Sequence, residues 1–155
     1  MCFEQVIRIM SALLTPVIAI VATYIAWQQW KTNRQKLAMD LYDRRLRIYQ
    51  EVRKILSSVF RDANISMQAL LEFYSSVSEV HFLFGPEISE YIDEIYKHGT
   101  NLGRYKDEYR DHTQPSSEGY DHKKVVEEMN KELQWLVYQF EPAKELFRKY
   151  LRLEN

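Results

Sequence analysis

The chain has 155 residues, of which 46% are hydrophobic and 28% are charged, and its formal net charge is −1. This length predicts one modest domain, and a mean hydropathy of −0.45 excludes a protein with several membrane spans. The single cysteine, Cys2, excludes both an internal disulfide and a zinc site built from two or more thiolates.

The first predicted element is an uncharged, apolar helix of 22 residues, Ile9 to Trp30. At about 1.5 Å per residue such a helix is roughly 33 Å long, which matches the hydrocarbon thickness of a bilayer. Two tryptophans end it and three basic residues follow, as at a membrane interface: Trp27, Trp30, Lys31, Arg34 and Lys36. We expect residues 1–30 to anchor the chain in a bacterial inner membrane. The N-terminus would then lie outside, with residues 31–155 in the cytoplasm.

Two other interpretations of this segment are a cleaved signal peptide and a buried core helix. A signal peptide carries positive charge before its apolar run and small residues at its end, but Trp27 to Lys31 occupy the cleavage region here. A core helix has one polar face, and the few uncharged polar residues between Ile9 and Trp30 make a weak one. The residues at the end of the segment and its weak polar face therefore both favour a membrane span over these two alternatives.

Small residues recur along this helix at steps of three and four: Ala12, Thr15, Ala19, Ala22 and Ala26. In lipid, such a stripe permits close approach of helices and predicts a self-associating span, although alanine is also common in spans by chance. The same spacing reaches Gln29 and Asn33, whose amides could bond between copies. Pro16 removes one helix donor and predicts a hinge.

The rest of the chain predicts further helices. With no glycine or proline between Val17 and Phe84, the first helix is expected to continue to about Arg61, and its core-facing stripe is Leu41, Ile48, Val52, Ile55 and Val59. The other predicted elements are a helix from Met67 towards Phe82, one from Pro86 to about Tyr109, an exposed loop from Arg110 to His122, and a helix from Asp121 to Leu153 kinked at Pro142. The predicted fold is all-α: one N-terminal transmembrane helix leading into an antiparallel bundle of about four helices, residues 31–155.

One constellation could hold a metal ion. Asp111 and His112 precede the polar loop, and Asp121 and His122 follow it, which would offer oxygen and nitrogen ligands for zinc or manganese. Both residue types are also common in loops, and Asp121 suits a helix N-cap, so no cofactor is expected. Of the other histidines, His81 is expected to pack in the core. His98 is expected to lie near the end of a helix, where an imidazole suits the negative pole.

No enzymatic motif is present. Ribonucleases of the HEPN type carry an arginine followed by a histidine after four to six residues, whereas the nearest approach here is Arg104 and His112. A phosphate-binding loop and a nucleophile elbow are missing as well. Residues 31–55 carry eight Lys or Arg against three Asp or Glu. Because this basic block directly follows the predicted span, anionic lipid headgroups are its expected partner in place of nucleic acid.

The segments "DLYDRRLRIY" and "FGPEISEYIDEIY" resemble those of a family of small bacterial single-span membrane proteins. The resemblance covers roughly residues 15 to 100. The layout is similar to that of the membrane accessory protein of type VI-B CRISPR systems. That similarity implies a membrane pore assembled around an N-terminal helix, and a HEPN-like helical domain in the cytoplasm.

Two hypotheses of function follow. The first is a non-enzymatic, membrane-anchored interaction or pore-forming module that assembles as a homo-oligomer through its span, in defence against phage. The second is a membrane-anchored enzyme, either a HEPN-like ribonuclease or a metal-dependent enzyme, that uses His112 and His122.

Overall fold

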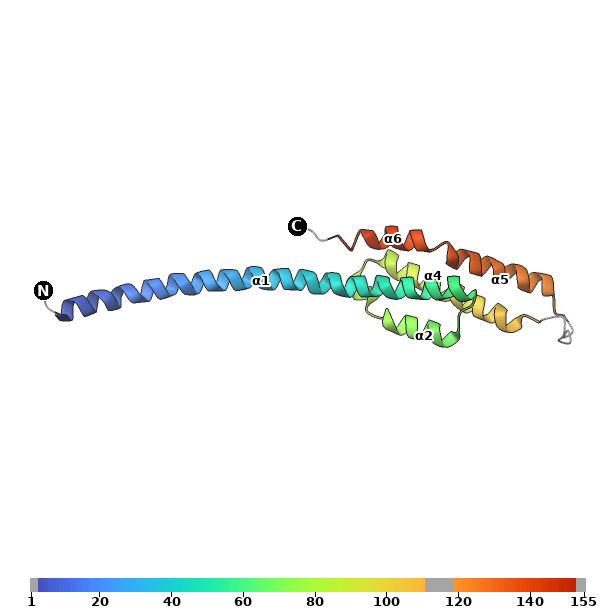
Figure 1. The fold of residues 1–155 in the computed structure, drawn as a ribbon, viewed down its shortest axis with the longest axis horizontal. Coiled ribbons are helices and arrows are strands. Elements are labelled where there is room, and N and C mark those ends of the chain that lie inside the picture. The colour runs from blue at the N-terminus through green and yellow to red at the C-terminus, as the bar shows by residue number, and fades with distance from the viewer. Residues whose placement is uncertain (1–2, 111–118, 153–155) are drawn as a thin grey trace. The chain divides into compact units, whose positions relative to one another are not determined.

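A computed structural model of the chain describes residues 3–110 and 119–152, without the side chains of residues 3–7, 9–13 and 15. Six helices follow one another in the described ranges, which hold no strand (Figure 1): α1 (Phe3–Asp62), α2 (Met67–Ser76), α3 (Val80–Leu83), α4 (Pro86–Glu108), α5 (His122–Val137) and α6 (Phe140–Arg148). The predicted all-α class is confirmed.

The chain divides into two compact units, Met1–Asp40 and Leu41–Asn155, and α1 continues across the boundary. The prediction placed its boundary earlier in the same helix, after Trp30. Nothing in the sequence ends the helix at either position, because the first glycine after Pro16 is Gly85.

The first unit consists of the N-terminal part of α1. The helix passes through Pro16 without interruption. Every side chain from Pro16 to Asp40 is exposed, including Leu37 and Met39. The described side chains of this unit therefore form no core.

The second unit has a hydrophobic core to which its main helices all contribute. From α1 come Ile48, Val52, Ile55, Leu56 and Val59. This is the predicted stripe with Leu56 added, while Leu41 at its start is exposed. The other helices add fully buried side chains: Leu70 in α2, Ile88, Ile92, Ile95 and Leu102 in α4, Leu136 in α5 and Phe147 in α6.

Helix α4 is the centre of this unit and contacts α2, α3 and α5. Its pairing with α5 is antiparallel, because Tyr91 bonds to Gln139 whereas the later residue Asn101 bonds to the earlier residue Glu132. The start of α4 is as predicted: Pro86 is its first residue, where the missing N–H costs no helix bond.

The predicted helix from Met67 towards Phe82 is wrong in its second half, because α2 ends at Ser76 and a turn leads into the short α3. Ser76 donates its hydroxyl to the carbonyl of Phe73, the kind of local bond that competes with helix continuation. The turn allows both Val77 and Val80 to enter the core. It also leaves His81 exposed, which corrects the expectation of a packed histidine.

The chain predicted as one last helix forms two separate helices, and the break lies before Pro142. Helix α5 ends at Val137, and α6 begins at Phe140, which makes Pro142 the third residue of α6. A continuous helix would set the proline ring against the carbonyl of Tyr138. In the first turn of a new helix the missing N–H has no partner to lose, so the chain breaks there instead of kinking.

Candidate functional site

The residues of the predicted span lie on one continuous helix. The side chains of Ala12 and Thr15 are outside the described set, whereas Ala19, Ala22 and Ala26 are exposed. Spacings of three and four in a helix place these alanines on one face. Pro16, the predicted hinge, is exposed as well.

The predicted interface residues follow on the same helix. Trp27 and Trp30 are 55% and 58% exposed, and Lys31, Arg34 and Lys36 are all exposed. The guanidinium of Arg34 lies over the Trp30 ring, 5.6 Å from its centroid. In the part of the chain that the structure describes, no helix combines the length and the apolar character needed to cross a membrane. The span from Ile9 to Trp30 stays a prediction from the sequence.

The predicted metal ligands are only partly described. Asp111 and His112 lie outside the described residues. Asp121 caps α5 by accepting a bond from the backbone N–H of Lys124 at 3.2 Å, and the His122 ring lies 3.2 Å from the Tyr120 hydroxyl through Nδ1. Within residues 3–110 and 119–152, no three His, Cys, Asp or Glu side chains gather as a metal site.

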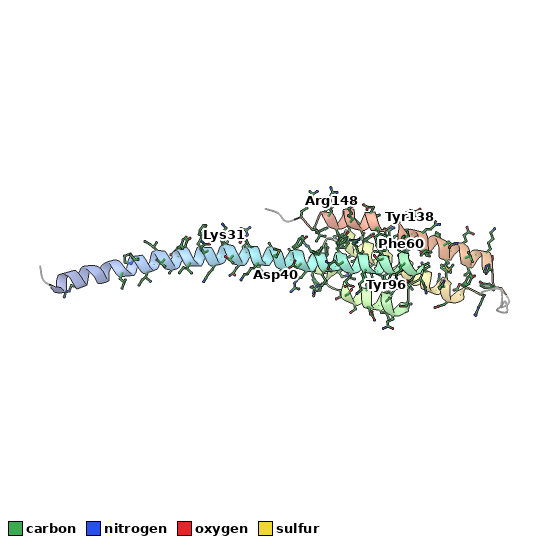
Figure 2. All side chains as sticks on the ribbon, viewed as in Figure 1. Lys31, Asp40, Phe60, Tyr96, Tyr138 and Arg148 are labelled. Carbon is green, nitrogen blue, oxygen red and sulfur yellow. The ribbon has the colours of Figure 1, made fainter. Side chains whose placement is uncertain are left out.

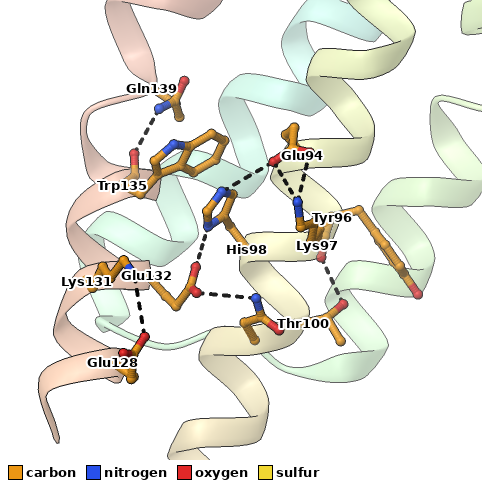
Figure 3. A network of polar contacts seen from close by, with 11 residues as sticks. Glu94, Tyr96, Lys97, His98, Thr100, Glu128, Lys131, Glu132, Trp135 and Gln139 are labelled. Atoms are coloured by element: carbon orange, nitrogen blue, oxygen red, sulfur yellow. Dashed lines mark hydrogen bonds and ion pairs between the residues drawn. The ribbon is translucent and has the colours of Figure 1, made fainter. Parts of the chain in front are cut away.

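A concentrated polar cluster of the second unit was not predicted from the sequence. It joins α4 to α5 and consists of Glu94, His98, Asn101, Glu132 and Trp135, which we call the His98 cluster (Figure 3). On α4, its members are four and three residues apart, so they share one face. The prediction placed His98 near a helix end, whereas it lies inside α4.

In the His98 cluster the imidazole lies between two carboxylates. Its Nδ1 contacts the Glu132 carboxylate, and its Nε2 lies 3.5 Å from Oε2 of Glu94. Asn101 donates its amide to the other Glu132 oxygen at 3.3 Å. The ring stacks on Trp135 with centroids 3.7 Å apart and an interplanar angle of 17°.

This geometry suits a structural clamp. Glu132 is 6% exposed, and a buried carboxylate is tolerated only where hydrogen bonds and an opposite charge replace water. The imidazole of His98 on α4 and the amide of Asn101 on the same helix both contact the Glu132 carboxylate of α5, so the cluster holds α4 against α5.

A second polar cluster surrounds Tyr150. Its hydroxyl donates to Oε1 of Glu87 at 2.7 Å and accepts from the backbone N–H of Gly85 at 3.0 Å. Arg45 of α1 donates to the carbonyls of Leu83 and Tyr150 at 3.0 and 3.3 Å. These bonds fix the start of α4 and the end of the described chain to α1.

The bond between Tyr150 and Glu87 shifts the pKa values of both groups. Hydrogen bonding from Tyr150 lowers the pKa of the Glu87 carboxyl, and the same bond raises the pKa of the Tyr150 hydroxyl. A lowered folded-state pKa stabilises the fold above the ordinary carboxyl pKa of 4.5, and this contribution is lost as the pH falls through the folded-state pKa.

We expect Tyr150→Phe to lower the urea midpoint of unfolding at neutral pH. The difference in midpoint between this variant and the unsubstituted chain should become smaller well below pH 4.5, where Glu87 is protonated in both. Tyr138→Phe, at a hydroxyl on a side chain that is 75% exposed, serves as the control and should change little at either pH. A difference in urea midpoint that is equally large at both pH values would contradict the assigned role of Glu87.

Comparisons with protein-family models, with curated proteins and with solved structures find no match to this chain.

Proposed function

We propose that the chain is a single-pass membrane protein whose first helix self-associates in the bilayer and carries a helical interaction domain. The observation that carries the proposal is the uncharged run from Ile9 to Trp30. A helix that is apolar all round belongs in a core or in a membrane. The described side chains of this run, Leu14 and residues 16–30, are all exposed and form no core.

The exposed apolar residues give the energetic reason for this proposal. Six apolar residues of this segment are each between 48% and 69% exposed: Leu14, Val17, Ile18, Ile20, Val21 and Ile25. Transfer of one such side chain from water to an apolar environment is worth about 1.5 to 3 kcal/mol when it is complete. Together they would make a large apolar surface, of the kind that soluble monomers rarely expose.

The polar groups of this segment fit the same environment. Thr23 donates its hydroxyl to the carbonyl of Ala19 at 2.8 Å, and Gln28 donates its amide to the Tyr24 hydroxyl at 3.1 Å. These donors thus find partners within their own helix, as polar groups in lipid require.

The ends of the segment give its orientation. Trp27 and Trp30 suit the headgroup layer, and Lys31, Arg34 and Lys36 suit anionic headgroups on the cytoplasmic side, at about 1 kcal/mol per basic residue. The N-terminus then lies outside, and residues 31–155 lie in the cytoplasm. Pore formation and a role in defence against phage stay predictions from the sequence.

The self-association is tested by enlarging the small residues. We expect Ala19→Leu with Ala22→Leu to reduce crosslinked oligomers in membranes several-fold, because bulkier side chains keep the helices apart. Ile18→Leu with Ile25→Leu, two changes that conserve volume, is the matched control. A chain that crosslinks only as a monomer before any substitution would refute the proposed assembly.

A further inference from the structure

We infer that the second unit binds a linear aliphatic diamine in the groove between α1 and α2, which Figure 1 shows side by side. The volume of this groove is about 370 Å³, within the range of about 300 to 1,000 Å³ that is usual for small-molecule sites. The inference goes beyond the proposed function, because none of the residues that line the groove belongs to the span.

The groove is elongated along both helices. Its first and last lining residues on α1 are Glu51 and Ser58, and those on α2 are Ala69 and Ser76. Each pair is seven residues apart, which at about 1.5 Å per residue is roughly 10 Å of helix. The groove therefore suits an extended ligand.

The apolar part of the lining consists of Ile55, Ala69 and Phe73. Ile55 and Phe73 are 6% and 3% exposed, so they belong to the core and hold this part of the groove in place. A methylene chain that lies against these three side chains loses contact with water, which favours binding.

The two hydroxyls of the lining can only accept hydrogen bonds from a ligand. Ser58 donates to the carbonyl of Ile55 at 2.8 Å, and Ser76 donates to the carbonyl of Phe73 at 2.7 Å. A hydroxyl has one hydrogen, so both hydrogens are already used within their own helices. The oxygen lone pairs remain.

The two carboxylates of the lining each keep one oxygen for a ligand. Oε2 of Glu51 accepts from Lys54 at 3.1 Å, and Oε1 of Glu72 accepts from Gln68 at 2.9 Å. Within the described residues, the other oxygen of each carboxylate has no hydrogen bond. Lys54 neutralises one of the two charges and is itself 76% exposed, so the lining keeps one negative charge in excess.

This chemistry selects a ligand with cationic donors at the ends of an apolar chain. An ammonium group has three donors and no acceptor, which matches the oxygens left free by the serines and the two carboxylates. Aliphatic amines, like the side chain of lysine, are protonated at neutral pH. Two carboxylates with a free oxygen can receive two ammonium groups, and the apolar lining receives the methylenes between them.

Calorimetric titration of the full chain in mild detergent, at constant ionic strength, tests the site. The probe is hexamethylenediamine, and hexylamine and hexanediol carry the same methylene chain with one ammonium group and with none. We expect saturable binding of the diamine, at least tenfold weaker binding of hexylamine, and none of hexanediol. Hexylamine that binds as tightly as the diamine would overturn the inference, and so would a diamine that gives no saturable heat.

Removing the carboxylates separates the site from a general attraction of cations. Glu51→Gln with Glu72→Gln should weaken diamine binding at least tenfold. Glu141→Gln with Glu145→Gln, on α6, removes the same charge from side chains that are 75% and 59% exposed. Glu145 pairs with Arg148, which Figure 2 labels. This control should bind the diamine within twofold of the unsubstituted chain, and equal weakening in both variants would overturn the site.

Filling the groove gives a second test. Ala69→Leu adds bulk to the apolar lining and should weaken diamine binding several-fold, whereas Ala69→Ser nearly conserves the volume and should keep most of the affinity. Far-UV circular dichroism of each variant checks that the helices are retained. A folded Ala69→Leu chain that binds as tightly as the unsubstituted chain would place the diamine elsewhere and overturn the inference.

Discussion

Phe147→Ala is expected to destabilise the second unit by about 3 to 5 kcal/mol, the usual cost of removing a phenyl ring from a close-packed core. Phe147 is fully buried, and its ring packs against those of Tyr49 and Phe84 at centroid distances of 5.4 and 5.2 Å. It therefore joins α6 both to α1 and to the turn before α4. Urea unfolding of the full chain in mild detergent, followed by far-UV circular dichroism, measures the loss.

Phe82→Ala is the matched control, because it deletes the same ring at a position that is 88% exposed. We expect a change within about 0.5 kcal/mol, as for most surface substitutions. Equal losses in the two variants would contradict the packing of α6 described above.

His98→Leu is expected to destabilise the same unit by about 1 to 3 kcal/mol, because it leaves the buried Glu132 carboxylate without its imidazole partner. The side chains of His98 and Glu132 are 20% and 8% exposed, so water cannot readily replace the lost contact. The stacking on Trp135 is lost as well, so a change in tryptophan fluorescence is expected as a second readout.

A double variant separates the charge from the packing. Adding Glu132→Met to His98→Leu removes the buried carboxylate together with its imidazole partner, and we expect most of the lost stability to return. Glu94→Gln, at a side chain that is 48% exposed, should cost less than about 1 kcal/mol. A double variant as unstable as His98→Leu would show that the shape of the side chains, and not the polar contact between His98 and Glu132, holds α4 against α5.

Local chemistry made several elements predictable. Gly85 and Pro86 stop one helix and start the next, and α4 begins at Pro86 as predicted. The absence of glycine and proline after Pro16 predicted that α1 would run on to about Arg61, and it ends at Asp62. Both outcomes depend on backbone preferences that act over a few residues.

The breaks after Ser76 and Val137 were not predictable in the same way, because neither has a glycine or proline at the break itself. The first break is decided by which valines enter the core, so it depends on packing between helices that are distant in sequence. The second is decided by Pro142, which acts on the carbonyl of Tyr138, four residues before it.

The His98 cluster was missed because its two halves are 34 residues apart along the chain. One signal was available: Val125, Met129, Glu132 and Leu136 fall at steps of four, three and four, which places an acidic residue on the core-facing stripe of α5. A carboxylate in that position requires a cationic or donor partner. The sequence alone does not say which of the basic residues supplies it.

The membrane span is the central claim, and fractionation of the full chain tests it most directly. We predict that the intact polypeptide stays with the membranes through an alkaline carbonate wash and needs detergent for release. Val17→Arg with Val21→Arg should weaken this retention, because each arginine at the middle of a span costs about 2.5 to 3.5 kcal/mol. Recovery of the unprocessed, unsubstituted chain in the aqueous fraction without detergent would contradict the account.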